Sequence, residues 1–181
     1  MGAAPKQAEY LSLLRPLNEL QIARGFAQLE KYLPAFKSCN VGQQQGVWCE
    51  QCAKCLFVFV MLYPFVEECD LTRQVFPSNL FEDDSLLPLL LDLADEARDK
   101  PLECVGTDQE VRAALWLTVQ KHTQEKLPLP SLLQSIKELV LDKYKLEELD
   151  TMTHQLLQAW NEQHFLDEKL ADLLKQGIQS K

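Results

Sequence analysis

The spacing of four cysteines restricts the fold of this chain more than any other feature of its sequence. Cys39, Cys49, Cys52 and Cys55 lie in the segment SCNVGQQQGVWCEQCAKC and follow a C-x9-C-x2-C-x2-C pattern. The last three can converge on one centre because two-residue gaps allow a tight turn, and the first closes a loop from the N-terminal side. Four thiolates arranged as a tetrahedron most often bind zinc, so we expect a structural zinc site.

The same cysteines are also compatible with roles other than zinc binding. Cysteine runs with two-residue gaps also hold iron–sulfur clusters. Disulfides and free buried thiols are further alternatives, but disulfides require an oxidising compartment. The start, MGAAPKQAEY, lacks the apolar core of a signal peptide, and the longest apolar run, 56–66, is shorter than a membrane span. We therefore expect a cytoplasmic protein without a membrane partner, whose thiols stay available for metal.

The composition narrows the class of partner. The formal net charge is −9 and the sequence pI is about 4.8, which argues against binding to a nucleic-acid backbone. An anionic small substrate stays compatible with this charge, because a local Arg or Lys can oppose the global field. The sequence contains no P-loop, G-x-G-x-x-G, G-x-S-x-G or H-E-x-x-H motif. The chain therefore lacks the usual parts of a nucleotide-hydrolysing enzyme.

Apolar residues recur at helical spacing, and no run shows convincing period-two alternation. We predict a mainly α fold: an irregular helical domain organised around the four-cysteine site, followed by an amphipathic helical tail. The proline-punctuated segment KLPLPSLL places the boundary between a zinc-binding domain, 1–126, and a helical tail, 127–181. The expected helices are 19–33, 56–65, 71–76, 86–97, one after Thr107, one from Ser131, one through Leu149 to Trp160, and one through Leu166 to Leu174 with Gly177 as its cap.

Several single residues have a structural interpretation. Thr107 and Glu110 have capping-box spacing, so Glu110 is either a cap or a site residue. Trp48 is expected to cover the metal site, and Cys69 to be structural. The histidines are all expected to be solvated helix residues: His122, His154 and His164.

Four sequence blocks occur in an order that goes beyond cysteine spacing: SLLRPLNEL, SCN, WCEQCAKCLFVFVMLYPF and KPLECVGTDQEVRAAL. Together they resemble the C-terminal portion of the UDP-N-acetyl-muramoyl-L-alanyl-L-glutamate epimerase family, over about residues 10 to 120. The cysteine block alone is also similar to the zinc-binding end of the 7-cyano-7-deazaguanine synthases. The KPLECVG and SLLRPL blocks favour the epimerase.

The resemblance implies an ATP-dependent inversion of the terminal L-glutamate of a UDP-linked muramoyl dipeptide, a peptidoglycan precursor, with AMP and pyrophosphate as by-products. Members of that family carry an N-terminal nucleotide-binding region with a glycine-rich phosphate loop, whereas this chain begins almost at SLLRPL. ATP and Mg²⁺ are therefore implied at a site outside this chain. We expect the isolated chain to be inactive without that region, supplied in cis or in trans.

The matched blocks also suggest site residues. Arg15, Lys54 and Lys100 are the candidate substrate-binding residues, because a guanidinium or ammonium group pairs with phosphate or carboxylate. Lys54 could instead offset the negative charge of four thiolates. The candidate catalytic residues are Glu103, as a base, and Cys104, as a thiolate base or an acid, in a loop between helices where site residues are often displayed. For Cys104, a small buried hydrophobe is the structural alternative.

Two other functions fit the sequence. One is a non-catalytic, zinc-stabilised helical module that binds a protein partner through its C-terminal helices. The other is the C-terminal part of an enzyme similar to the 7-cyano-7-deazaguanine synthases, which would require the nucleobase-site residues of that family upstream.

Overall fold

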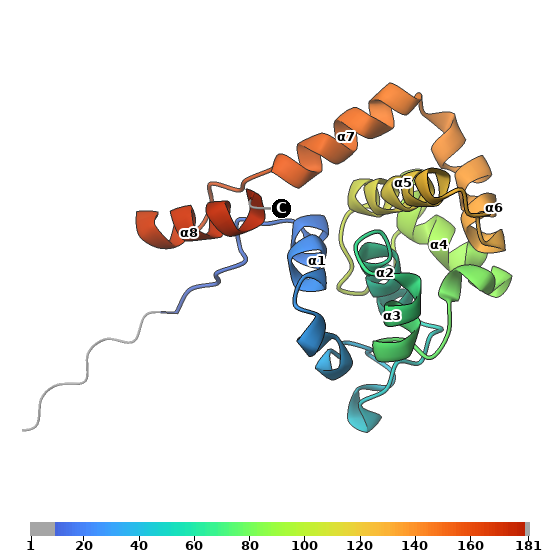
Figure 1. The fold of residues 1–181 in the computed structure, drawn as a ribbon, viewed down its shortest axis with the longest axis horizontal. Helices are drawn as coiled ribbons and strands as arrows, with labels where there is room; N and C mark the ends of the chain where they lie inside the picture. The colour runs from blue at the N-terminus through green and yellow to red at the C-terminus, as the bar shows by residue number, and fades with distance from the viewer. Residues whose placement is uncertain (1–9, 180–181) are drawn as a thin grey trace, which may run out of the picture. The chain divides into compact units, whose positions relative to one another are not determined.

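The computed structural model describes residues 10–179, and every regular element within this range is a helix (Figure 1). The prediction of a mainly α fold is confirmed. The α-helices are α1 (Glu19–Ala27), α2 (Ala53–Leu62), α3 (Glu68–Gln74), α4 (Leu87–Ala94), α5 (Asp108–Glu125), α6 (Ser131–Leu139), α7 (Leu146–Gln158) and α8 (Glu168–Gln179). Shorter 3-10 helices are η1 (Glu30–Ala35), η2 (Gln43–Gln45), η3 (Leu80–Glu82), η4 (Asp84–Leu86) and η5 (Leu141–Lys143).

The chain divides into two compact units. One combines the described parts of Met1–Leu17 and Trp160–Lys181, including α8, and the other is Asn18–Ala159. In the second unit, α6 packs against α4 and α7 packs against α5. The domain boundary predicted after residue 126 stays a prediction.

Helix α2 is the centre of the second unit. It contacts α1, α4 and α5, and all of its residues except Lys54 are buried. The run from Leu56 is apolar on every face, which suits a helix enclosed on all sides, and the predicted central buried helix is confirmed. Pro64 limits the helix, because proline has no N–H to donate and its ring clashes with the preceding turn.

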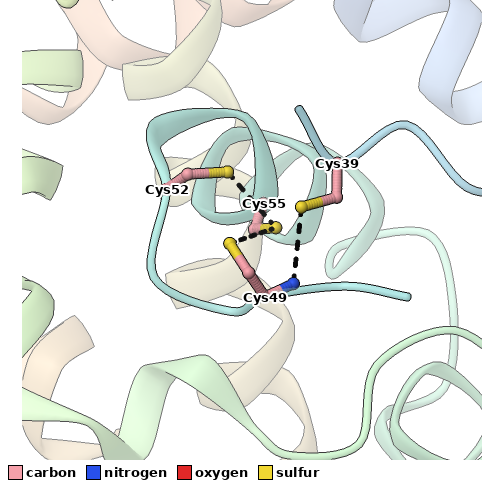
Figure 2. Close-up of side chains that lie close together, drawn as sticks. All are labelled: Cys39, Cys49, Cys52 and Cys55. Carbon is pink, nitrogen blue, oxygen red and sulfur yellow. Dashed lines mark hydrogen bonds between the residues drawn. The ribbon is translucent and has the colours of Figure 1, made fainter. Parts of the chain in front are cut away.

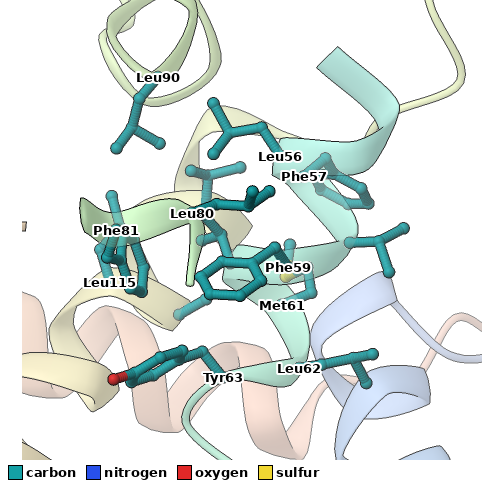
Figure 3. Close-up of a cluster of buried hydrophobic side chains, with 14 of the residues drawn as sticks. Leu56, Phe57, Phe59, Met61, Leu62, Tyr63, Leu80, Phe81, Leu90 and Leu115 are labelled. Atoms are coloured by element: carbon teal, nitrogen blue, oxygen red, sulfur yellow. The ribbon is translucent and has the colours of Figure 1, made fainter. Parts of the chain in front are cut away.

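Aromatic side chains fill the core beside the C-terminal half of α2 (Figure 3). The Phe59 ring lies 5.2 Å from Phe81 and 5.3 Å from Phe76, both in edge-to-face geometry. Tyr63 lies 4.9 Å from Phe81. Complete burial of one such side chain contributes about 1.5–3 kcal/mol, and aromatic pairs add about 0.5–1.5 kcal/mol beyond that. This cluster therefore anchors α2 independently of any bound ligand.

Helix α5 begins with the predicted capping box. The Thr107 hydroxyl accepts the Glu110 N–H at 3.2 Å, and Glu110 Oε2 accepts the Thr107 N–H at 2.6 Å. Glu110 Oε1 also accepts the N–H of Glu19, the first residue of α1, at 2.7 Å. The buried Glu110 carboxylate thus caps two helices, which decides in favour of its structural interpretation.

Several predicted helix boundaries were wrong. α1 ends at Ala27, and Pro34 lies inside η1 rather than terminating α1. A 3-10 helix accommodates this chain path because its bonds link residues three apart, whereas proline in an α-helix interior would clash with the carbonyl four residues earlier. Gly177 lies inside α8, so it is not a C-cap.

The segment around α3 and α4 also differs from the prediction. α3 starts at Glu68 with Glu67 as its N-cap, so Asp70 is within the first turn. Asp83 caps η4, and α4 begins only at Leu87. α4 ends at Ala94 because Asp95 adopts an extended backbone and its carboxylate accepts the Ala97 N–H at 3.1 Å.

The prediction that His122 is solvated was wrong. Its side chain is buried, with Nδ1 2.9 Å from the Pro128 carbonyl oxygen and Nε2 3.2 Å from the Tyr63 hydroxyl. The Tyr63 hydroxyl also donates to Glu68 at 2.8 Å. His122 continues the face formed by Val111, Leu115 and Val119 at helical spacing. Because α2 and α7 pack against α5, its side chain is enclosed with that face.

Candidate metal centre

The four predicted cysteines converge on one point (Figure 2). The sulfur atoms of Cys39, Cys49, Cys52 and Cys55 all lie within 4.8 Å of one another. Cys55 Sγ is 3.7 Å from Cys49 Sγ and 3.5 Å from Cys52 Sγ. A tetrahedral zinc site with Zn–S bonds of about 2.3 Å separates its sulfurs by about 3.8 Å. The cluster could therefore hold a metal ion with little rearrangement.

Two of these cysteines belong to the N-terminus of α2. Cys52 is the N-cap residue and Cys55 lies in the first turn. The positive end of the helix dipole favours thiolates at this position. Cys39 and Cys49 come from the preceding loop, and Cys39 is buried like Cys55.

Backbone N–H groups hold the Cys39 sulfur. Gly42 donates to Cys39 Sγ at 3.1 Å and Cys49 donates at 3.4 Å. Burial alone would raise the pKa of Cys39, but these donors bring it down to about 6. Burial raises the pKa of Cys52 and of Cys55. A metal ion must displace the protons of Cys52 and Cys55 when it binds, so we expect metal binding to weaken as pH falls.

The loop between Cys39 and Trp48, the Cys39 loop, folds tightly around Gly42. A Cβ atom at this position would lie 2.2 Å from the Val47 carbonyl oxygen. Only glycine allows this approach, and the same turn orients the Gly42 N–H toward Cys39.

Glu50, in the gap between Cys49 and Cys52, has a role that its sequence position did not indicate. Its φ is 60°, a left-handed conformation that non-glycine residues seldom adopt. Its Oε1 atom accepts both the N–H and the hydroxyl of Ser78, each at 2.9 Å. The tight turn between the two cysteines is therefore tied to the segment between α3 and η3.

Trp48 is buried, with ring centroids 5.6 Å from Phe36 and 4.6 Å from Phe76. Its predicted role as a cover for the sulfurs stays a prediction. Cys69, predicted to be structural, is an exposed residue of α3.

The structure brings three of the predicted site residues together beside the cysteines. Glu103 Oε2 accepts the backbone N–H of Lys54 at 3.0 Å, and Lys54 Nζ donates to the Cys104 carbonyl oxygen at 2.5 Å. Cys104 itself is exposed rather than a buried hydrophobe. The loop after α4 therefore lies against the N-terminus of α2.

Lys100 and Arg15 take no part in the contacts among Glu103, Lys54 and Cys104. Lys100 Nζ donates to the Gly106 carbonyl oxygen, and burial lowers the pKa of Lys100. Gly106 itself is closely surrounded, since a Cβ there would lie 2.9 Å from both Glu110 Oε2 and Phe57 Cζ. Arg15 is exposed in the first unit, in a turn closed by its N–H to the Ser12 carbonyl oxygen at 3.3 Å. The substrate-binding roles of Arg15, Lys54 and Lys100 stay predictions.

Sequence reasoning did not single out Asn40. Its Nδ2 atom donates to Glu103 Oε2 at 3.1 Å. The only sequence signal was its place in the SCN block, next to Cys39.

Comparisons with known proteins agree on one family. Residues 35–150 match the model of the MurL C-terminal domain. A relative from Salinispora tropica, named UDP-N-acetyl-alpha-D-muramoyl-L-alanyl-L-glutamate epimerase, is 40% identical over 128 residues, 68% of this chain and 28% of the relative. A relative of the same name from Xanthomonas oryzae pv. oryzae is 41% identical over 115 residues, 59% of this chain and 25% of the relative.

A third relative of that name, from a Micromonospora species, is 36% identical over 123 residues, 66% of this chain and 27% of the relative. The chain thus spans about a quarter of the length of the curated relatives it matches. No solved structure matches the chain. The family model covers the four cysteines, Lys54 and the loop from Lys100 to Gly106. Because it matches more than half of the chain, the chain belongs to the MurL C-terminal domain family.

Proposed function

We propose that this chain is the C-terminal part of an ATP-dependent epimerase that converts the terminal L-glutamate of UDP-N-acetylmuramoyl-L-alanyl-L-glutamate to D-glutamate. The observation that carries the proposal is the family match over residues 35–150, together with 36–41% identity to relatives named as this epimerase. ATP, Mg²⁺ and the nucleotide-binding region are part of the proposal, with their site outside this chain.

The chemistry requires activation of the substrate. A free carboxylate resists loss of the neighbouring α-proton, because the carbanion would form beside a negative charge. Attack of the glutamate carboxylate on the α-phosphorus of ATP releases pyrophosphate and converts the carboxylate to an acyl adenylate. Its carbonyl then accepts the developing charge, while a base removes the α-proton and an acid returns one to the opposite face. Hydrolysis of the adenylate releases AMP and the D-glutamate product.

Lys54 and Lys100 are our candidates for binding the anionic groups of the substrate. Both ammonium groups donate to backbone carbonyls of one loop, at Cys104 and at Gly106. A carboxylate or phosphate is a stronger acceptor for an ammonium group than a carbonyl, so a bound anion could replace these contacts. Exposed Cys104 adjoins them and remains our candidate for proton transfer; Glu103 stays a predicted base.

Zinc is the metal that we propose for the four cysteines. Its role would be structural, since four protein thiolates complete a tetrahedron and leave no position for water or substrate. The metal would fix the Cys39 loop against α2 and so support the loop that bears the candidate site residues.

A chimeric enzyme tests the proposed reaction. The matched region of the Xanthomonas oryzae relative is replaced by the aligned residues of this chain, and conversion of L- to D-glutamate in the UDP-linked dipeptide is followed by chiral chromatography. We expect ATP-dependent epimerisation with release of pyrophosphate. An inactive chimera that is folded and metal-loaded would contradict the assignment, and epimerisation by this chain alone would contradict the need for a nucleotide-binding region.

Variants of the chimera assign the lysines. Lys54→Ala and Lys100→Ala should lower kcat/KM by about 10–100-fold, the loss expected for one charge-assisted contact. Lys143→Ala is the matched control, because this lysine pairs with Asp95 at 3.0 Å outside the metal centre. Unchanged kinetics in both of the first two variants would remove them from the substrate site.

The non-catalytic module remains a second candidate because of side chains in the first unit. Phe165 is 92% exposed and Leu173 of α8 is 56% exposed, so both side chains offer apolar surface to a partner. A chain ending at Ala159 tests it, since this cut falls between the two units. Partner binding that survives the cut would exclude α8 as the binding surface.

No helix within residues 10–179 has the length and apolar character to cross a membrane.

A further inference from the structure

We infer that Glu103 is a positioning residue for the metal centre, which joins the two ligand-bearing segments through one carboxylate oxygen. The inference rests on the proposed metal binding by the four cysteines, and it assigns to Glu103 a task separate from proton transfer.

The bridging geometry involves a single atom. Glu103 Oε2 accepts Asn40 Nδ2 at 3.1 Å and the Lys54 backbone N–H at 3.0 Å. Asn40 follows Cys39 directly, and Lys54 lies between Cys52 and Cys55. The carboxylate therefore connects the loop that supplies one ligand to the helix start that supplies two others.

The Cys39 loop has few other means of holding its position. Val41 and Val47 are 70% and 50% exposed, so the loop buries little apolar surface between Cys39 and Trp48. Its remaining ties are polar, chiefly the N–H groups of Gly42 and Cys49 on the Cys39 sulfur. Losing the Asn40–Glu103 contact would therefore remove one of the few polar ties that hold this loop beside α2.

The same carboxylate completes the N-terminus of α2. Cys52 is the N-cap residue, but its side chain makes no capping hydrogen bond, so the first turn needs another acceptor. Glu103 supplies that acceptor to the Lys54 N–H, and a negative charge at this position is favoured by the helix dipole. Because Cys52 and Cys55 sit in this turn, its order determines the direction of their sulfur atoms.

Metal release from the full chain tests the inference. The zinc-loaded protein is mixed with excess chromophoric chelator, and the rate of zinc transfer is followed for Glu103→Ala and Glu103→Gln. We expect the alanine variant to release zinc about tenfold faster, near the lower end of the effect of removing residues that support metal ligands. The glutamine variant should stay within about threefold of the parent, because its amide oxygen can accept both donors.

The hydrogen bond from Asn40 to Glu103 is tested separately. Asn40→Ala should accelerate release less than Glu103→Ala, and the double variant should match Glu103→Ala, because both changes break the same bridge. Asn40 is exposed, so its variant keeps the test valid if Glu103→Ala does not fold. The Co²⁺-substituted protein gives a second readout, since a loosened sulfur set changes the intensity of its visible absorption.

A matched control separates positioning from ordinary helix capping. Glu148 accepts the Lys145 backbone N–H at 2.9 Å at the start of α7, which bears no cysteine. Glu148→Ala should lower the melting temperature without changing zinc release. Equal release rates for Glu103→Ala, Asn40→Ala and the parent would overturn the inference. A parent chain that binds no metal would instead overturn the proposed metal centre itself.

Discussion

The two ends of α2 are stabilised by different forces. At the N-terminal end, Cys52 and Cys55 face two loop cysteines, and the surrounding loop is polar and largely exposed. At the C-terminal end, Phe59 and Tyr63 lie in a buried aromatic cluster. One end therefore relies on hydrogen bonds and, in our proposal, on a bound metal, whereas the other relies on removal of apolar surface from water. The difference predicts that metal removal and core truncation affect the protein independently.

The largest effect is expected from Cys52→Ser. Serine is a better N-cap than cysteine, so this change keeps or improves the start of α2 while it removes one thiolate. Structural zinc binding supplies about 10–16 kcal/mol in small metal-dependent domains, and we expect a loss of several kcal/mol of it. Elemental analysis after dialysis against a chelator measures the retained metal. Cys69→Ser, outside the cluster, is the control, and full metal retention by Cys52→Ser would contradict a four-thiolate site.

Phe59→Ala changes the core beside the C-terminal half of α2. Phe59 is fully buried among Phe76, Phe81 and Tyr63, so the change should lower the free energy of unfolding by about 3–5 kcal/mol. Urea titration measures this loss, and the folded fraction should still carry its metal. Phe165→Ala, at an exposed phenylalanine, should change the stability little. Metal loss in folded Phe59→Ala would show that the two ends are coupled.

Gly42→Ala tests the tight turn around Cys39. The added Cβ would meet the Val47 carbonyl at 2.2 Å, so we expect a loss of about 1–3 kcal/mol and faster metal release. Gly25→Ala is the matched control, because nothing lies within 4 Å of its Cβ and the residue is exposed in α1. That change should instead stabilise the protein by about 0.5–1 kcal/mol. Thermal and urea unfolding of both variants measure whether each change raises or lowers the free energy of unfolding.

His122→Ala is expected to lower the free energy of unfolding least among these changes, by about 1–2 kcal/mol. It removes the partner of the Pro128 carbonyl and of the buried Tyr63 hydroxyl. His154→Ala, at an exposed residue of α7, should stay within about 0.5 kcal/mol of the parent. Equal stabilities of the two variants would argue that the network around His122 contributes nothing, and metal content should be unchanged in both.

The sequence by itself determined the features that depend on residues close together in the chain. The cysteine spacing predicted the convergent sulfurs, Thr107 and Glu110 predicted a capping box, and the continuous apolar run predicted buried α2. In each case a turn of helix or a two-residue gap brings the groups together, so the pattern carries the geometry. The family blocks were recognisable for the same reason, because they are contiguous.

Only the tertiary structure decided which distant groups became partners. Asn40 and Glu103 are 63 residues apart, and the second role of Glu110, as a cap for α1, joins it to Glu19 across 91 residues. The contact between His122 and the Tyr63 hydroxyl likewise joins residues 59 apart. Such pairings are set by how the buried surfaces of several helices fit together, and local spacing does not encode that fit. The sequence therefore specified the four converging cysteines, and the packing of the fold selected the distant residues that bond to their neighbours.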